Sequence, residues 1–329
     1  MRLAPKAFLP LIATLLSVAL APGASAQETT PKPAWDLSYE EIEAEVTKVR
    51  AGRSLQPASW PNGARVAVLL AFDVDNETDN MASGDMSIFS MSFHEYGARK
   101  GLGRILAALD AYDLPASFFI PTVSARLAPE MIPAIQESGR HEIGVHGWVH
   151  EWSSKISGEE EREFTRRAVE YLEQVTGERP VGYRAPFGDV SERTLDILRD
   201  MGFLYDSSLL ADDTPYELLQ NGKPTGMIEL PLSFILEDSI LHVANDFSGG
   251  ILTPDDVLDA WKAEFDRAYE EGTTFLLITH PHIIGQRSRI EVLEKLIAHM
   301  KSRPNVWFAT HRQAAEHVKQ KLDAASSAQ

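Results

Sequence analysis

Residues 66–72 read VAVLLAF and are followed directly by Asp73-Val74-Asp75. A short, continuous apolar run bounded by turn signals is typical of a strand that is buried on both faces of a parallel sheet. In α/β barrels, catalytic groups come from the C-terminal ends of such strands. Because alternate side chains of a strand point to the same side, we expect Asp73 and Asp75 to face one metal ion or one water molecule. The alternative is that both carboxylates only end the strand and solvate the following loop.

The pattern of this first strand recurs along the chain, where apolar runs alternate with segments of helical periodicity. Further strands are expected at 116–120, 141–145, 181–188 (a strand and its turn), 203–206, 228–235, 273–279 and 306–310. Helices are expected at 102–112, 129–137, 159–175, 191–201, 254–271, 289–301 and 314–322. Repeated strand–helix units indicate a parallel sheet, and this many units favour a barrel. We therefore predict an α/β fold, a distorted (β/α) barrel of seven or eight mostly parallel strands, as a single domain over residues 65–322.

The first 26 residues have the three parts of a secretory signal peptide. Arg2 and Lys6 form a positive start, residues 7–21 are nearly all apolar, and Ala24-Ser25-Ala26 is a small-x-small cleavage signal. We therefore expect an exported protein, either periplasmic or secreted. Residues 27–64 are predicted to form a linker, a helix over 39–50 capped by Ser38, and a loop over 53–63. Residues 323–329 are predicted to be a flexible tail.

Charge and cysteine content narrow the range of functions. The formal net charge is −17, and removal of Arg2 and Lys6 with the signal peptide would make it −19. This acidic balance argues against nucleic acid as a partner and against a basic membrane-binding patch, so no membrane association is expected after signal cleavage. The chain contains no cysteine, so a metal ion would have to be held by His, Asp or Glu. The charge places no restriction on neutral sugars, and homo-oligomerisation stays open.

Two histidines, His146 and His150, follow the strand expected at 141–145 and are four residues apart. This spacing lets both imidazoles converge on one point, and neutral imidazole is a common ligand of zinc. Alone, such a pair also fits a polar turn beside a strand. Three further strand ends carry polar groups, namely Asp73 with Asp75, Arg184, and His280. Because the carboxyl ends of parallel strands share one face of a barrel, the four ends together predict a metal site.

These motifs resemble those of the polysaccharide deacetylase superfamily, the NodB-homology domain of carbohydrate esterase family 4, over about residues 66–308. The family pairs a base aspartate with a metal aspartate, here Asp73 and Asp75. Its His-x-x-x-His motif corresponds to His146 and His150. Its Arg-x-Pro turn and its histidine after an apolar strand correspond to residues 184–187 and to His280. Membership would imply a barrel fold and metal-dependent hydrolysis of an amide.

The chain departs from the commonest form of this family at two places. Val74 separates the two aspartates, and Phe187-Gly188 stands where a tyrosine is usual. Both departures are similar to a branch that holds bacterial peptidoglycan deacetylases, allantoinase-like enzymes and cyclic-imide hydrolases. The resemblance therefore supports the fold while it widens the range of substrates.

The residue types also suggest the chemistry. Asp75, His146 and His150 offer three ligands and leave a position for water, which is the open arrangement of a catalytic zinc site. Zinc is the expected divalent metal, with cobalt, nickel and manganese as alternatives. Asp73 would accept the proton of the attacking water, and His280 would protonate the leaving amine. Arg184 would hold Asp73 in its ionised form, and a backbone N–H near Phe187 would stabilise the oxyanion.

Other polar residues carry weaker signals. His282 and Arg287 would contact substrate or only shape a loop, and Asp206 would orient Arg184 or only end a turn. Residues 78–91 are expected to form an irregular loop that lines the mouth of the barrel. The remaining histidines have no constellation and are read as structural or surface residues: His94, His141, His242, His299, His311 and His317.

Three functions are weighed. The first is an exported metal-dependent hydrolase that removes N-acetyl groups from peptidoglycan or another N-acetylglucosamine polymer. The second is a metal-dependent hydrolase of a small cyclic amide or imide. The third is a glycan-binding protein that has lost activity, against which the retention of Asp73, Asp75, His146, His150 and His280 argues.

Overall fold

The computed structural model of the protein describes residues 32–242 and 251–326. The chain divides into two units, residues 1–42 and residues 43–329, and all of its described strands belong to the second. In the first unit, the Ser38 hydroxyl accepts a hydrogen bond from the Glu41 N–H (3.2 Å), as predicted for a helix cap. The predicted signal peptide lies outside the described residues.

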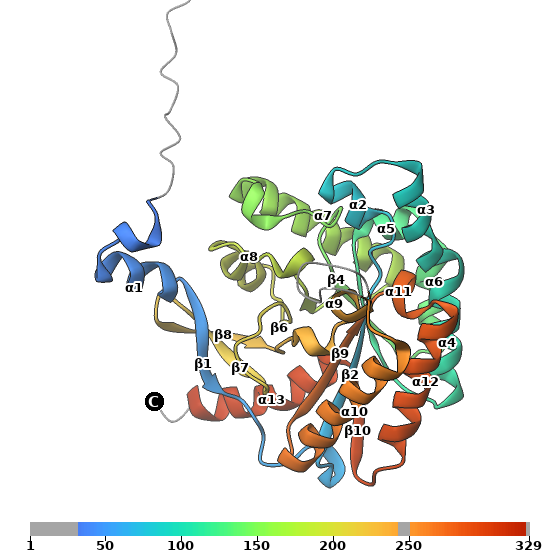
Figure 1. Ribbon diagram of the computed structural model, residues 1–329. Helices are drawn as coiled ribbons and strands as arrows, with labels where there is room; N and C mark the ends of the chain where they lie inside the picture. The colour runs from blue at the N-terminus through green and yellow to red at the C-terminus, as the bar shows by residue number, and fades with distance from the viewer. Residues whose placement is uncertain (1–31, 243–250, 327–329) are drawn as a thin grey trace, which may run out of the picture. The chain divides into compact units, whose positions relative to one another are not determined.

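Ten strands among the described residues join in one sheet (Figure 1). Eight of them run parallel, in the order β8-β6-β5-β4-β3-β2 with both β9 and β10 beside β2, and the antiparallel pair β7 and β1 extends the β8 edge. A parallel bridge between Glu237 and Ile278 links the segment after β8 to β9. The predicted α/β class and distorted barrel are confirmed. The strands are β1 (Val49–Ser54), β2 (Val66–Asp73), β3 (Ser117–Ile120), β4 (Glu142–Val145), β5 (Gly182–Tyr183), β6 (Tyr205–Asp206), β7 (Tyr216–Gln220), β8 (Lys223–Glu229), β9 (Thr274–Thr279) and β10 (Val306–Ala309).

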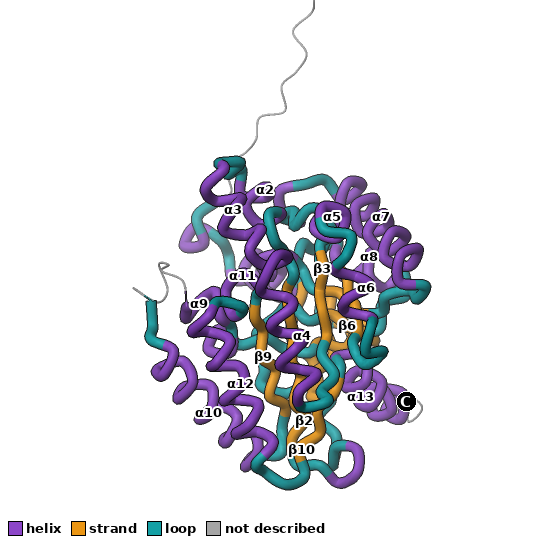
Figure 2. Tube along the Cα trace, turned by 90° about the vertical axis from the view of Figure 1, so that its right-hand side faces the viewer, coloured by secondary structure: helices purple, strands orange, loops and turns teal. Residues whose placement is uncertain are grey.

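Helices follow most of the parallel strands and cover the outer face of the sheet, where α4, α10 and α12 lie over β2 and β9 (Figure 2). None of the helices in the described ranges is long and apolar enough to cross a membrane. The helices are α1 (Tyr39–Thr47), α2 (Thr78–Ser83), α3 (Ile88–Tyr96), α4 (Leu102–Ala111), α5 (Thr122–Leu127), α6 (Met131–Gln136), α7 (Gly158–Thr176), α8 (Thr194–Asp200), α9 (Asp238–His242), α10 (Pro254–Glu271), α11 (Pro281–Ile284), α12 (Arg287–Lys301) and α13 (His311–Ser326).

Strand β2 is buried along its whole length and separates two apolar clusters. Its even-numbered side chains, from Val66 to Phe72, pack in the outer cluster with the covering helices. Its odd-numbered side chains, from Ala67 to Ala71, pack in the inner cluster with residues of β9 and α13. The same alternation places Asp73 on the inner side, directly beyond Ala71. The strand pattern thus delivers a carboxylate to the interior of the curled sheet.

Several predicted elements differ from the observed ones. The helix expected over residues 39–50 ends at Thr47, and β1 occupies part of the expected loop. The strand expected at 228–235 lies earlier, as β8, and β7 was not predicted. These two strands form a hairpin whose turn, Asn221-Gly222, has φ of +50° and +71°. An Asn-Gly pair is a strong hairpin signal because both residues adopt positive φ readily, so this error was avoidable.

The segment expected as an irregular loop over residues 78–91 instead forms α2 and the start of α3. The chain after α3 passes very close to α11. A side chain at Gly101 would meet the Pro281 carbonyl oxygen at 1.9 Å, so only glycine permits this approach. The close contact brings α3 and the residues after β9 to the same end of the barrel.

Candidate functional site

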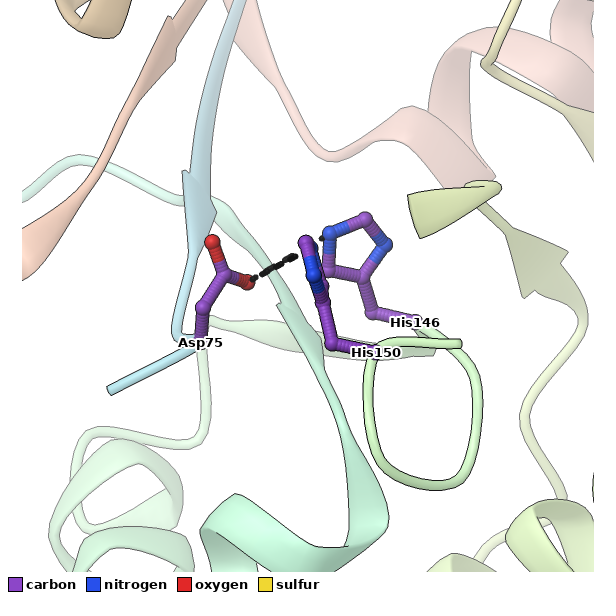
Figure 3. Close-up of side chains that lie close together, drawn as sticks. All are labelled: Asp75, His146 and His150. Atoms are coloured by element: carbon purple, nitrogen blue, oxygen red, sulfur yellow. Dashed lines mark ion pairs between the residues drawn. The ribbon is translucent and has the colours of Figure 1, made fainter. Parts of the chain in front are cut away.

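Three ligand-type side chains meet at the carboxyl ends of β2 and β4 (Figure 3). Asp75 Oδ1 lies 3.4 Å from His146 Nε2 and 3.7 Å from His150 Nε2. One ligand atom from each residue lies within 4.8 Å of the others, and all three residues are buried. His146 Nδ1 donates to the Arg184 carbonyl oxygen at 2.8 Å, which leaves the Nε2 lone pair facing Asp75. The predicted metal ligands therefore converge.

The electrostatics of this group suit a cation. Burial lowers the pKa of His146, and burial together with neighbouring imidazoles lowers the pKa of His150 well below its ordinary value. Burial also raises the pKa of Asp75 well above its ordinary range, and Asp75 Oδ1 has no hydrogen-bond partner. Two neutral imidazoles and one carboxylate oxygen without a hydrogen-bond partner fit a divalent metal of the zinc, cobalt, nickel or manganese type.

A buried ion pair lies beside this group. Arg184 Nη1 donates to Asp73 Oδ1 at 2.7 Å, and both side chains are almost fully buried. The guanidinium also donates through Nε to the Ser207 carbonyl (2.9 Å) and through Nη2 to the Ser207 hydroxyl (2.9 Å). It lies over the ring of Phe119, 4.2 Å from its centroid. Asp73 Oδ2 is 3.9 Å from His146 Nε2, so this carboxylate faces the candidate metal position.

On the other side of Asp75 stands a second polar pair. His280 Nε2 is 3.5 Å from Asp75 Oδ2, and His280 Nδ1 is 2.7 Å from Asp238 Oδ1. The Asp238 carboxylate also accepts the backbone N–H groups of His280 (2.9 Å) and Ile284 (3.1 Å). Burial opposes the charged imidazole, but Asp238 together with the nearby carboxylates of Asp75 and Asp73 outweighs it and raises the pKa of His280 well above its ordinary value. Asp238 thus orients the ring and favours its protonated form.

The three ligand-type residues, the Asp73–Arg184 pair and His280 line a cavity of about 780 Å³, and Asp238 lies behind His280 outside the lining. Trp152 and Phe187 stack at the wall, with ring centroids 4.0 Å apart and planes at 9°, and the Phe187 ring lies 4.3 Å from that of His150. His150 and Phe187 both have positive φ, +64° and +59°, which is uncommon outside glycine and often marks functional sites. Other apolar residues complete the lining, including Phe93, Leu210, Phe234 and Ile240.

Of the residues predicted with weaker roles, the structure places some at the cavity and others elsewhere. Phe187 and His282 line it. Asp206 is buried outside the lining, where it accepts a hydrogen bond from the Ser208 hydroxyl (2.6 Å) and makes no hydrogen bond to Arg184. Arg287 begins α12 and is not among the lining residues. The catalytic, oxyanion and substrate roles stay predictions.

Several residues at or beside the cavity were not predicted from the sequence. His94, read as structural or surface, is buried at the cavity wall, and its Nε2 lies 3.2 Å from Asp79 Oδ2. Asp238 and Trp152 were not singled out at all. None of these residues ends a predicted strand or belongs to a spaced motif, so no local pattern marked them. His94 and Asp238 lie on α3 and α9, and Trp152 lies in the segment that follows β4 and His150.

Comparisons with known proteins agree with this arrangement. A family profile described as Polysaccharide deacetylase matches residues 90–205. The crystal structure of a putative polysaccharide deacetylase from Mycobacterium smegmatis is 36% identical, covers 83% of this chain and 96% of its own, and superposes with a TM-score of 0.75. A Helicobacter pylori protein named peptidoglycan deacetylase is 28% identical over 76% of this chain and 95% of its own. The crystal structure of an allantoinase is 29% identical over 78% of this chain and 91% of its own, with a TM-score of 0.70.

Proposed function

The chain belongs to the polysaccharide deacetylase family of amide hydrolases, and we propose that it is an exported, metal-dependent enzyme that removes N-acetyl groups from peptidoglycan or a related N-acetylglucosamine polymer. The single observation that carries this proposal is the way three groups of buried polar side chains lie next to one another. The Asp75, His146 and His150 group has the Asp73–Arg184 pair on one side and the His280–Asp238 pair on the other.

A divalent metal, for which we favour zinc, would activate the attacking water and polarise the amide carbonyl when held by these three ligands. Asp73 would take the proton of that water through Oδ2, since its Oδ1 accepts a hydrogen bond from Arg184 and its Oδ2 faces His146. The guanidinium pairs with this carboxylate and fixes its direction, because a buried charge needs a partner of opposite charge.

The leaving amine needs a proton as the C–N bond breaks. His280 offers one from Nε2, while Asp238 holds its Nδ1. Water thereby supplies OH to the acetyl carbon, its proton goes to Asp73, and the amine leaves with a proton from His280. A backbone N–H in the turn around Phe187 would stabilise the oxyanion. The products are acetate and a free amino sugar.

Substrate class and export rest on two further observations. The H. pylori relative that covers most of this chain is named a peptidoglycan deacetylase. Residues 1–26 have the sequence of a signal peptide, and cell-wall glycans lie outside the cytoplasm. Stacked Trp152 and Phe187 offer an apolar wall of the kind that packs against a sugar ring.

A second candidate is hydrolysis of a small cyclic amide or imide. The observation that favours it is the similarity to the allantoinase structure, with a TM-score of 0.70. The candidate catalytic side chains are also almost fully buried, as suits a small substrate. The same residues would perform this reaction, because ring opening also needs a nucleophilic water, a base and a proton for the leaving nitrogen.

The test measures acetate release from peptidoglycan and from N-acetylglucosamine oligomers by the chain from residue 27 onward, with and without zinc. His146→Ala and Asp73→Asn are run alongside, with ring opening of cyclic imides as the parallel assay. Zinc-dependent acetate release that both variants lose is the expected result. Ring opening without acetate release would select the second candidate, and a chain that binds no metal and hydrolyses neither substrate would refute both.

A further inference from the structure

Two polar side chains outside the predicted motifs lie beside His150, one of the predicted metal ligands. Asp79 lies on α2 and His94 on α3, and both line the cavity beside His150. The Asp79 carboxylate lies between His94 and His150. Its Oδ2 is 3.2 Å from His94 Nε2, and its Oδ1 is 3.7 Å from His150 Nδ1. The Asp79 carboxylate therefore links α2 and α3 to the predicted metal ligand His150.

His150 needs such a partner. Its Nε2 faces Asp75, while its Nδ1 is buried and has no hydrogen-bond partner among the described residues. An imidazole that binds a metal through Nε2 carries its proton on Nδ1, and metal-bound histidines nearly always donate that proton to a carboxylate, a carbonyl or water. Asp79 Oδ1 is the acceptor within reach, although 3.7 Å is still too long for a hydrogen bond.

His94 determines where Asp79 points. When His94 donates its Nε2–H to Asp79, its Nδ1 is an acceptor, and the Asn80 side-chain amide on α2 donates to it at 3.0 Å. The His94 ring contacts the ring of His282, with centroids 4.4 Å apart and planes tilted by 40°. His94 is buried, whereas the Asp79 side chain is 31% exposed and would be free to rotate without this contact.

We infer that Asp79 and His94 are positioning residues for the metal ligand His150, with Asp79 accepting the Nδ1 proton of His150 and His94 holding the other oxygen of Asp79. This inference rests on the metal requirement of the proposed function. It also means that metal binding orders α2 and α3, because the ligand and these helices share the Asp79 carboxylate.

Cobalt affinity is the first test, measured by competition with a chromogenic chelator. We expect Asp79→Asn to weaken Co²⁺ binding by about 10–100-fold, as is typical when the partner of a metal-bound histidine is changed. His94→Phe, which keeps a ring against His282, should weaken it less. The double variant should match Asp79→Asn alone, because His94 acts only through Asp79. Asp85→Asn, an exposed acid between α2 and α3, is the matched control and should bind like the wild type.

The visible spectrum of bound Co²⁺ and hydrogen exchange give independent readouts. The cobalt bands should shift in Asp79→Asn and stay unchanged in Asp85→Asn. Amides of residues 78–96 should exchange more slowly with metal than without it in the wild type, and Asp79→Asn should remove this difference. Binding and spectra identical to the wild type in Asp79→Asn, or exchange that is insensitive to metal, would overturn the inference while leaving the proposed function intact. A wild-type chain that binds no cobalt or zinc would overturn both.

Discussion

Arg184→Met should strongly destabilise the fold, because it removes the positive charge that the buried Asp73 carboxylate requires. Asp73 is only 4% exposed and Arg184 only 2%. Methionine occupies a similar length but leaves Asp73 Oδ1 without its 2.7 Å partner and also loses two hydrogen bonds to Ser207. The expected loss of stability therefore follows from the contacts of the Arg184 guanidinium.

The expected size can be worked out from this environment. Breaking a buried ion pair by removing one partner costs about 3–5 kcal/mol, since the other charge stays buried and unpaired. We therefore expect Arg184→Met to lower the free energy of unfolding by about 4 kcal/mol, a large part of the roughly 5–15 kcal/mol of a typical domain. Adding Asp73→Asn removes the unpaired negative charge of residue 73, so the double variant should be more stable than Arg184→Met alone.

Urea unfolding followed by tryptophan fluorescence measures this, because the chain has six tryptophans. A chelator must be present so that metal binding to the folded state adds nothing. Arg166→Met is the matched control, because Arg166 is 46% exposed and its pairs with Glu163 and Glu170 lie on the surface. That variant should lose less than about 1 kcal/mol. A small loss in Arg184→Met, or a double variant that is less stable than Arg184→Met, would refute the reasoning.

Three further outcomes are expected. Asp238→Asn should lower kcat by about 10–100-fold with metal content unchanged, because His280 loses the charge that favours its protonated form; assays of rate and bound metal check this. Burial raises the pKa of Asp206 to about 6 and the pKa of Glu229 well above its ordinary value. The folded state therefore holds protons that the unfolded state releases, and stability falls as pH rises from the ordinary carboxyl range through these raised values. Relative to the wild type, Glu229→Gln should gain stability between about pH 5 and 8 in urea unfolding, and a constant difference would contradict the assignment. Chelation should abolish hydrolysis and lower the thermal midpoint, and zinc should restore both; a midpoint that ignores the chelator would argue against metal in the folded state.

The parts of the site that could be predicted all lie at the ends of apolar strands. The run at residues 66–72 announces β2, and its alternation places Asp73 and Asp75 on the inner side. The spacing of His146 and His150 likewise follows β4 directly. Such features are local, since the period of a strand and the order of residues along it are written in consecutive positions.

The β7–β8 hairpin and three polar residues of the site were not predicted, for different reasons. The β7–β8 hairpin was readable from Asn221-Gly222, and its omission was an error of interpretation. Asp79, His94 and Asp238 carried no comparable signal, because polar residues on short helices look the same whether they face solvent or a cavity. Their roles depend on how those helices pack over the sheet.

The order of residues along the chain is enough to predict the βα alternation, the interior direction of the β2 carboxylates and the residue types able to hold a metal. The tertiary structure is needed to identify the other partners of the site residues: Asp238 beside His280, and Asp79 between His150 and His94. The two kinds of feature differ in how far apart along the chain the interacting residues lie. Strand periodicity and side-chain chemistry belong to neighbouring residues, whereas burial, and with it the need of each charge for a partner, arises only when distant segments exclude water from the same cavity.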